Sequence, residues 1–122
     1  MAVPITPPCN TGAFIERLGG DAELARQMAR VFLAQIDRLT AAVHAALAAA
    51  DPEALRTAAH AVKGSAANFD AAPTVAVAAA IEQHGRSGDI AAAAGLIDTL
   101  DLEVARLVTA LREFGGSQTC AS

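Results

Sequence analysis

A histidine, a lysine and a glycine lie close together on one predicted helix. The segment reads His60-Ala61-Val62-Lys63-Gly64-Ser65, and Lys63 is the only lysine in the chain. Residues three and four apart lie on the same side of an α-helix, so Lys63 and Gly64 are both neighbours of His60. A neutral imidazole beside an ammonium group and bare backbone suits a nucleophile that accepts a phosphoryl group, because the cation offsets the negative charge that arrives.

The predicted helix around this segment turns His60 toward solvent. Plotted at about 100° per residue, its apolar residues fall in one sector, and His60 lies roughly 140° from the centre of that sector. The apolar sector consists of Leu55, Ala58, Ala59, Val62, Ala66 and Phe69. A nucleophile that reacts with another protein has to be reachable from outside, so this placement fits the chemistry.

The neighbours of this histidine have distinct expected roles. Lys63 would stabilise the phosphoryl group, and Arg56, one turn earlier, could add to that effect. Gly64 costs about 1 kcal/mol relative to alanine inside a helix, so its presence suggests clearance for a partner, to which the small Ala67 would add. Ser65 lies beside the apolar sector, where it either supports the site or bonds to a backbone carbonyl one turn earlier.

Composition favours an all-α protein of one domain. Of the 122 residues, 53% are hydrophobic, many of them alanine, and the only aromatic residues are four phenylalanines. Alanine favours helices, whereas β-branched and aromatic residues favour strands. A net charge of −4 without a basic cluster argues against nucleic acid and anionic membranes as partners. The sequence has no long apolar stretch without charges, so no membrane span is predicted. The N-terminus lacks the features of a signal peptide.

Helix start and stop signals divide the chain into five expected helices. They run from Asn10 or Thr11 to residue 18, from Asp21 to about 49, from Asp51 to about 69, from about Pro73 to 85–88, and from Asp89 to 114. Asp and Asn cap helix N-termini, and the pairs Gly19-Gly20 and Gly115-Gly116 are expected to end helices.

Two of these helices have long apolar faces. The expected inward residues are Leu24, Met28, Val31, Phe32, Ile36, Leu39, Val43 and Leu47 in the second helix, and Ala93, Ile97, Leu100, Val104, Leu107, Leu111 and Phe114 in the last. Short loops between long amphipathic helices predict an antiparallel up-and-down four-helix bundle with a short extra N-terminal helix. The bundle domain would cover residues 10–116, between flexible tails at 1–9 and 117–122.

The segment around His60 resembles the signature of the histidine-containing phosphotransfer (HPt) domain family. The family pattern His-x-x-Lys-Gly-Ser/Ala reads here as His60, Lys63, Gly64 and Ser65. The resemblance covers roughly residues 14–114. It includes the segments 17–21 and 58–68 and the pairs Ile81-Glu82 and Gly88-Asp89.

The resemblance implies a phosphoryl carrier of two-component phosphorelays rather than an enzyme with its own turnover. His60 would take a phosphoryl group from a receiver-domain aspartate and pass it to another, with Lys63 stabilising it. The partners would be receiver domains of hybrid histidine kinases and response regulators, and these would supply magnesium, so the chain itself needs no cofactor. We expect a cytoplasmic monomer without a nucleotide site.

One position departs from the family pattern. The family usually has glycine where this chain has Asp70, ten residues after the histidine. Aspartate tolerates left-handed backbone better than most residues and can also cap the next helix. The turn is therefore expected to survive with a local shift.

Other interpretations of the chain remain open. A non-phosphorylated adaptor could bind and inhibit a receiver or kinase domain, and a purely structural helical dimer is a third possibility. His44 and His84 lack the companions of His60 and are expected to be surface or packing residues rather than part of a metal site. Cys9 and Cys120 are expected to be unpaired thiols near the chain ends, as in a reduced cytoplasmic protein.

Overall fold

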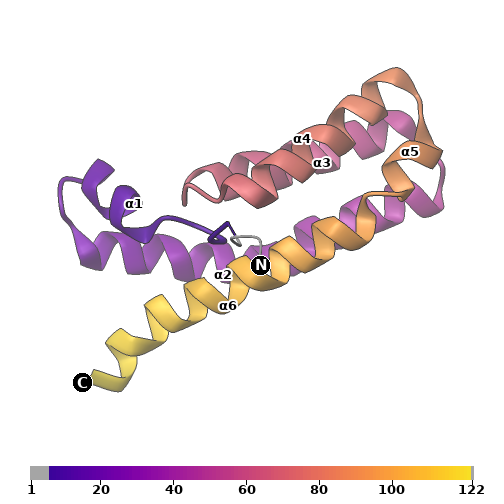
Figure 1. The fold of residues 1–122 in the computed structure, drawn as a ribbon. Coiled ribbons are helices and arrows are strands. Elements are labelled where there is room, and N and C mark those ends of the chain that lie inside the picture. Colours follow the sequence, from indigo (N-terminus) through magenta and orange to yellow (C-terminus); the bar gives the residue numbers. More distant parts are fainter. Residues whose placement is uncertain (1–5, 122) are drawn as a thin grey trace, which may run out of the picture.

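The computed structural model describes residues 6–121, with side chains to residue 114. This part of the chain is all-helical. The helices are α1 (Thr11–Arg17), α2 (Ala22–Ala48), α3 (Pro52–Ala67), α4 (Ala72–Ser87), α5 (Ile90–Ala94) and α6 (Ile97–Ala121) (Figure 1).

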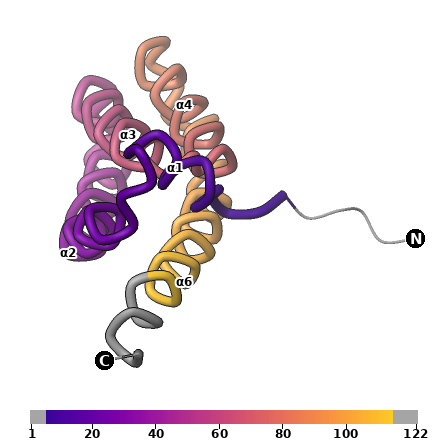
Figure 2. The backbone as a smooth tube through the Cα atoms, turned by 90° about the vertical axis from the view of Figure 1, so that its left-hand side faces the viewer, coloured from indigo at the N-terminus to yellow at the C-terminus, as the bar shows by residue number. Residues whose placement is uncertain are grey.

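Four long helices surround one interior. Helix α3 packs against α2 and α4, and α6 packs against the same two helices from the other side. Each long helix runs opposite to the long helix before it (Figure 1), and the view along the molecule shows all four around a common centre (Figure 2). Helix α1 lies against the beginning of α2.

Side-chain caps begin most of the helices, as the sequence predicts. The side chains of Asn10, Asp21, Asp51 and Asp89 each accept a hydrogen bond from the backbone N–H three residues later. Each of these bonds satisfies one donor that has no partner within its helix.

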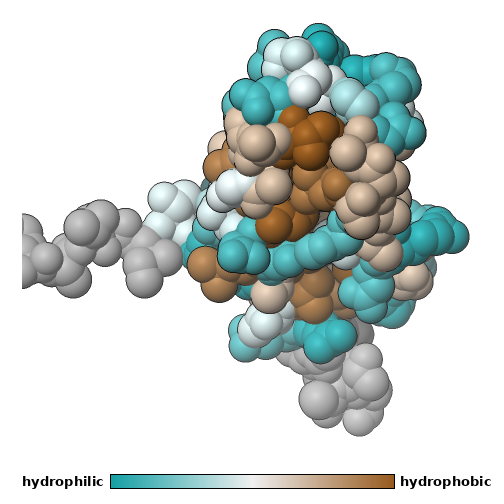
Figure 3. Space-filling model, turned by 90° about the vertical axis from the view of Figure 1, so that its right-hand side faces the viewer, coloured by the Kyte–Doolittle hydropathy of each residue, from teal (hydrophilic) through white to brown (hydrophobic). Residues whose placement is uncertain are grey.

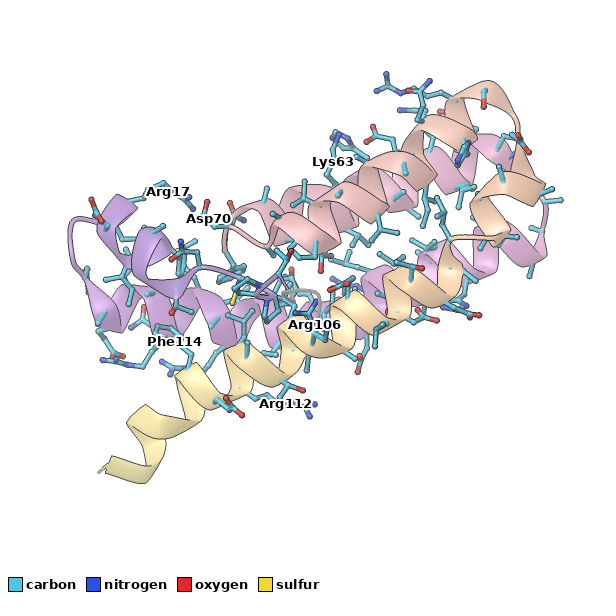
Figure 4. All side chains as sticks on the ribbon, viewed as in Figure 1. Arg17, Lys63, Asp70, Arg106, Arg112 and Phe114 are labelled. Carbon is cyan, nitrogen blue, oxygen red and sulfur yellow. The ribbon has the colours of Figure 1, made fainter. Side chains whose placement is uncertain are left out.

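Helix α4 begins without such a cap. Its N-cap is Ala71, and Pro73 in the first turn has no N–H to satisfy. The capping role considered for Asp70 was therefore wrong. The Asp70 carboxylate instead pairs with Arg17 of α1 at 2.5 Å, while Arg17 also donates to the backbone carbonyl of Asn68 (Figure 4).

The core is built from a few large side chains and many alanines. Phe69, two residues after the end of α3, contacts Phe14 of α1 and Phe32 of α2, with ring centroids 4.7 and 5.2 Å apart. The largest fully buried side chains include Ile36, Val43, Leu55, Val62, Ile81, Leu100, Leu107 and Leu111. This packing orients the outer face of α3.

The inner face of α2 differs in part from the prediction. Leu24 and Val31 were expected to point inward, but their exposed fractions are 40% and 57%. The fully buried positions near them are Ala25 and Ala29. Small alanines let α2 approach its neighbours closely, and this turns the larger side chains outward.

The single last helix that the sequence predicts is two helices. Helix α5 ends at the Gly95 C-cap, and the N–H of Leu96 bonds to the carbonyl of Ala93, which closes a tight turn before α6 begins. Glycine is a weak helix former, and here the chain changes direction (Figure 1). The expected inward residues from Leu100 to Leu111 are nevertheless buried.

The end of the molecule that carries α5 shows apolar side chains in its middle, bordered by hydrophilic ones (Figure 3). Ile90, Leu96 and Ile97, at α5 and the turn after it, are only partly buried against the core.

The last helix also ends later than predicted. The backbone continues as helix through Gly115 and Gly116 to Ala121, where an end before residue 117 was expected. The other expected flexible tail covers residues 1–9, of which residues 1–5 lie outside the described part of the chain. Thr6 accepts a hydrogen bond from Arg106 of α6, and Cys9 is half-buried against the core.

Among the helices of the described residues, α2 alone is long and apolar enough to cross a membrane by length and composition. In the fold it supplies six buried core residues and packs against α3 and α6.

Candidate functional site

His60 stands on the outer face of α3. Its side chain is 62% exposed, whereas its neighbours Ala59 and Val62 are fully buried. The helix is anchored by its apolar sector, which holds the imidazole at the surface, as the sequence predicts.

A buried carboxylate on α4 binds both His60 and Lys63. The Glu82 side chain is only 4% exposed. Its Oε2 lies 2.9 Å from Nδ1 of His60, and its Oε1 lies 2.6 Å from Nζ of Lys63. Arg86, one turn further along α4, reaches the same Oε2 at 3.2 Å. Lys63 lies on the outer side of the α3–α4 pair, away from α6 (Figure 4).

This arrangement selects one tautomer of His60. An ionised carboxylate only accepts hydrogen bonds, so Nδ1 carries the proton and donates it to Glu82. The other ring nitrogen, Nε2, then has its lone pair available on the exposed side of the ring.

Glu82 stays ionised because its partners outweigh its burial. The hydrogen bond from Lys63 lowers the pKa of Glu82, removal from water raises it, and the hydrogen bond from His60 lowers it further. The net direction is below the usual value of a glutamate. A negative charge is therefore maintained behind the imidazole.

Lys63 was expected to lie free beside the imidazole, and the structure places its ammonium group differently. Its ammonium group is bound to Glu82 rather than standing free beside the imidazole. Both residues bind the same carboxylate, so they remain neighbours. An ammonium group has three N–H donors, so Lys63 can bind Glu82 and still donate to a group on Nε2.

Arg56 is directed away from this cluster. Its guanidinium group pairs with Glu53, one turn earlier on the same helix. The hydrogen bond from Arg56 lowers the pKa of Glu53. The cation that joins Lys63 at Glu82 is Arg86, which was not among the predicted site residues.

The small residues beyond His60 leave its surroundings open. Gly64 and Ala67 are exposed, and a Cβ added at Gly64 would meet no atom within 4 Å. Nothing inside the protein therefore requires glycine at this position.

Ser65 lies on the other flank, in a shallow apolar depression between α2 and α3. The residues that line the depression are Leu24, Gln27, Met28, Val31, Phe32, Gln35, Ser65, Asn68 and Phe69. The exposed Leu24 and Val31 thus belong to a surface that continues from the site.

The other histidines lie apart from this cluster. His44 of α2 pairs with Asp101 of α6, with Nε2 2.9 Å from Oδ1. His84 is half-buried. Within residues 6–114, no group of three His, Cys, Asp or Glu side chains is arranged to hold a metal ion.

Glu82 is the main site residue that sequence reasoning missed. It lies 22 residues after His60, so no helical spacing links the two. Two features of the sequence pointed to Glu82. It is the carboxylate directly after the inward Ile81, and with Ile81 it forms the pair that matched the family pattern.

Comparison with known proteins gives a similar solved structure. Histidine-containing phosphotransfer protein B (HptB) from Pseudomonas aeruginosa PAO1 superposes with a TM-score of 0.84 and 22% sequence identity. The match covers 93% of this chain and 98% of that one. This likeness establishes the shared fold. No curated protein sequence matches the chain significantly.

A family profile identifies the chain from its sequence. The profile of the Hpt domain matches residues 27–112, which include α3, α4 and the whole cluster around His60. The match spans more than half of the chain, and the chain therefore belongs to the Hpt domain family.

Proposed function

We propose that this protein carries a phosphoryl group on Nε2 of His60 between receiver-domain aspartates of a two-component phosphorelay. The observation that carries this proposal is the contact of Nδ1 with Glu82, which leaves Nε2 of an exposed imidazole as the free nucleophile.

The transfer step uses the charges around the ring. The Nε2 lone pair attacks the phosphorus of an aspartyl phosphate, and the P–O bond to the aspartate breaks, so the carboxylate leaves with the electron pair. The phosphorylated ring keeps its Nδ1 proton and becomes positively charged, and Glu82 balances that charge. Lys63 and Arg86 lie on the same carboxylate, where their remaining N–H groups can stabilise the phosphoryl oxygens.

The partner surface extends from His60 across α3 to α2. Gly64 and Ala67 provide clearance, and the apolar depression with Leu24 and Val31 provides surface that a receiver's own apolar face can cover. Ser65 lies at the edge of this depression and supports its shape. The receiver supplies magnesium and the groups that activate its aspartate.

The remaining features of the proposal follow from this role. The protein acts as a cytoplasmic monomer, without a cofactor, a nucleotide site, a nucleic-acid partner or a membrane partner. Its helices α2, α3, α4 and α6 form an antiparallel up-and-down four-helix bundle with α1 as the short extra helix. Such a bundle presents His60 on a rigid element.

Phosphotransfer from a receiver tests the proposal directly. Receiver domains from the same genome are charged with labelled acetyl phosphate and mixed with wild type, His60→Gln and His44→Gln. We expect label on wild type and on His44→Gln, and none on His60→Gln. The transferred label should be labile in acid and stable in alkali, as phosphohistidine is.

The alternative functions give different results. Binding of a receiver without transfer to any of the three proteins would replace the carrier by an inhibitory adaptor. Transfer to His60→Gln at the wild-type rate would show that another residue is the acceptor. A concentration-dependent dimer in sedimentation would contradict the monomer.

A further inference from the structure

Helices α3 and α4 make an unusually close contact at Gly85. A Cβ added at this buried glycine would lie 2.9 Å from the backbone nitrogen of Arg56 and 3.0 Å from its Cα. Real Cβ atoms do not approach other atoms so closely, and the atoms that would be met belong to backbone that cannot rotate away. Only glycine allows this spacing between the two helices.

The close contact lies one helical turn from the site. Gly85 follows Glu82 by three residues on α4, and Arg56 precedes His60 by four residues on α3. Residues three or four apart share a helix face, so the contact and the Glu82–His60 pair lie in the same α3–α4 interface. The separation of the helices at Gly85 therefore limits their separation at Glu82.

Glu82 needs a short distance between the helices. From α4 its carboxylate reaches two groups of α3 at once, Nδ1 of His60 at 2.9 Å and Nζ of Lys63 at 2.6 Å. Lys63 is long and flexible and can follow a shift of α4. The imidazole is short and stiff, so its hydrogen bond is the contact that is sensitive to the spacing.

We propose that Gly85 is a positioning residue, which holds α4 close enough to α3 for Glu82 to fix the tautomer of His60. This inference deepens the proposed function and rests on it for its biological meaning. The physical claim concerns only the unphosphorylated protein. With alanine at position 85, α4 has to move away by a few tenths of an ångström or more, and the Nδ1–Oε2 hydrogen bond is lost or lengthened.

The test measures the His60 ring nitrogens by NMR in uniformly ¹⁵N-labelled protein. Wild type should show the tautomer protonated on Nδ1. Gly85→Ala should lose it and shift toward the tautomer protonated on Nε2, with the protein still folded. Gly12→Ala is the matched control, because a Cβ there meets only the Asn10 side chain at an ordinary 3.6 Å. Its His60 signals should equal those of wild type.

A second variant tests the same spacing without altering the helix contact. Glu82→Asp shortens the carboxylate by one methylene while Gly85 is retained, so it should produce the same tautomer shift. This arm remains decisive if Gly85→Ala does not fold. Wild-type ring signals in a folded Gly85→Ala, or in Glu82→Asp, would overturn the proposal. Neither readout needs a receiver, so this outcome is independent of whether His60 accepts phosphate.

Discussion

In the proposed carrier role, Glu82 is the residue that acts most directly on His60. It is almost fully buried, and its two oxygens bind the imidazole, Lys63 and Arg86. It therefore sets both the tautomer of the nucleophile and the positions of the two nearest cations.

Replacing Glu82 by alanine should slow phosphoryl transfer without unfolding the protein. Both ring tautomers then become populated, so in part of the protein Nε2 carries the proton and has no free lone pair. We expect a loss on the order of tenfold in the rate of uptake from a charged receiver, the lower end of the effects seen when a carboxylate that orients a metal-binding histidine is removed. Stopped-flow or quenched-flow measurements at saturating receiver check this. An unchanged rate in a folded variant would show that Glu82 has only a structural role.

Gly64→Ala should make the protein more stable and phosphoryl transfer slower. A Cβ at Gly64 meets no atom of the protein within 4 Å, so alanine should raise the free energy of unfolding by about 1 kcal/mol through its better helix propensity. The same Cβ projects from the exposed face beside His60, where a receiver has to approach, so transfer should slow. Urea unfolding and the transfer rate are measured on the same samples. Faster or unchanged transfer would contradict the proposal that Gly64 provides clearance for the receiver.

Part of the candidate site could be predicted from the sequence. The spacing of His60, Lys63 and Gly64 is local, so the periodicity of one helix was enough to place them on a common outer face. Arg56 was expected at the site and pairs with Glu53 instead, because a residue on the same helix was within easier reach. Glu82 could not be placed, because its contact depends on how two helices pack rather than on one helix.

At the scale of the helices, the connection from α2 to α3 contains a residue under backbone strain. Ala50 follows the α2 C-cap with a φ of +51°, in the left-handed region that favours glycine. Its N–H bonds to the carbonyl of Leu47, and the N–H of Asp51 bonds to that of Ala46, the pattern that ends many helices with glycine.

Ala50→Gly should therefore stabilise the protein. Relief of the left-handed strain outweighs the extra backbone freedom of glycine in the unfolded chain, for a net gain of about 0.5–1 kcal/mol. Thermal or urea unfolding measures the gain, and the ring signals of His60 should not change. A lower stability would show that Ala50 is not strained.

Asp70 gives a matched case in which strain and an ion pair oppose each other. Its φ is also +51°, but its carboxylate binds Arg17. Asp70→Gly should gain less than Ala50→Gly, because it loses the contact that ties α1 to the α3–α4 turn. In an Arg17→Ala background, Asp70→Gly should gain more than it does in wild type, because no ion pair is then lost. Equal gains in both backgrounds would show that the ion pair contributes nothing.

The helices were predicted more completely than their packing. Caps such as Asp21, Asp51 and Asp89 are local signals, so the starts of α2, α3 and α5 were confirmed. The turn at Gly95 was missed because the apolar spacing continues across it without a break. The line of apolar residues spaced three and four apart predicts Leu24 and Val31 inside, whereas close packing of helices favours Ala25 and Ala29 at the contact.

For the whole molecule, the shared carboxylate connects the site to stability. The net charge is −4, yet two cations and an imidazole gather around Glu82, which joins α4 to α3. The proton that Glu82 binds at low pH would break these contacts. The stability of the fold should therefore depend on pH through this residue.

The sign of this dependence follows from the lowered pKa of Glu82. Between the folded pKa and the ordinary value of 4.5, the unfolded chain binds the proton and the folded protein does not. The contribution of Glu82 is thus fully present above pH 4.5 and is lost as the pH falls through the folded pKa. Urea unfolding of wild type and Glu82→Gln at pH 7 and near pH 3 should show a difference in unfolding free energy that becomes smaller on acidification.

The difference between wild type and Gly12→Ala should stay constant, because that substitution changes no titratable group. A difference for Glu82→Gln that is constant or grows toward low pH would show that the cations around Glu82 do not lower its pKa in the folded protein.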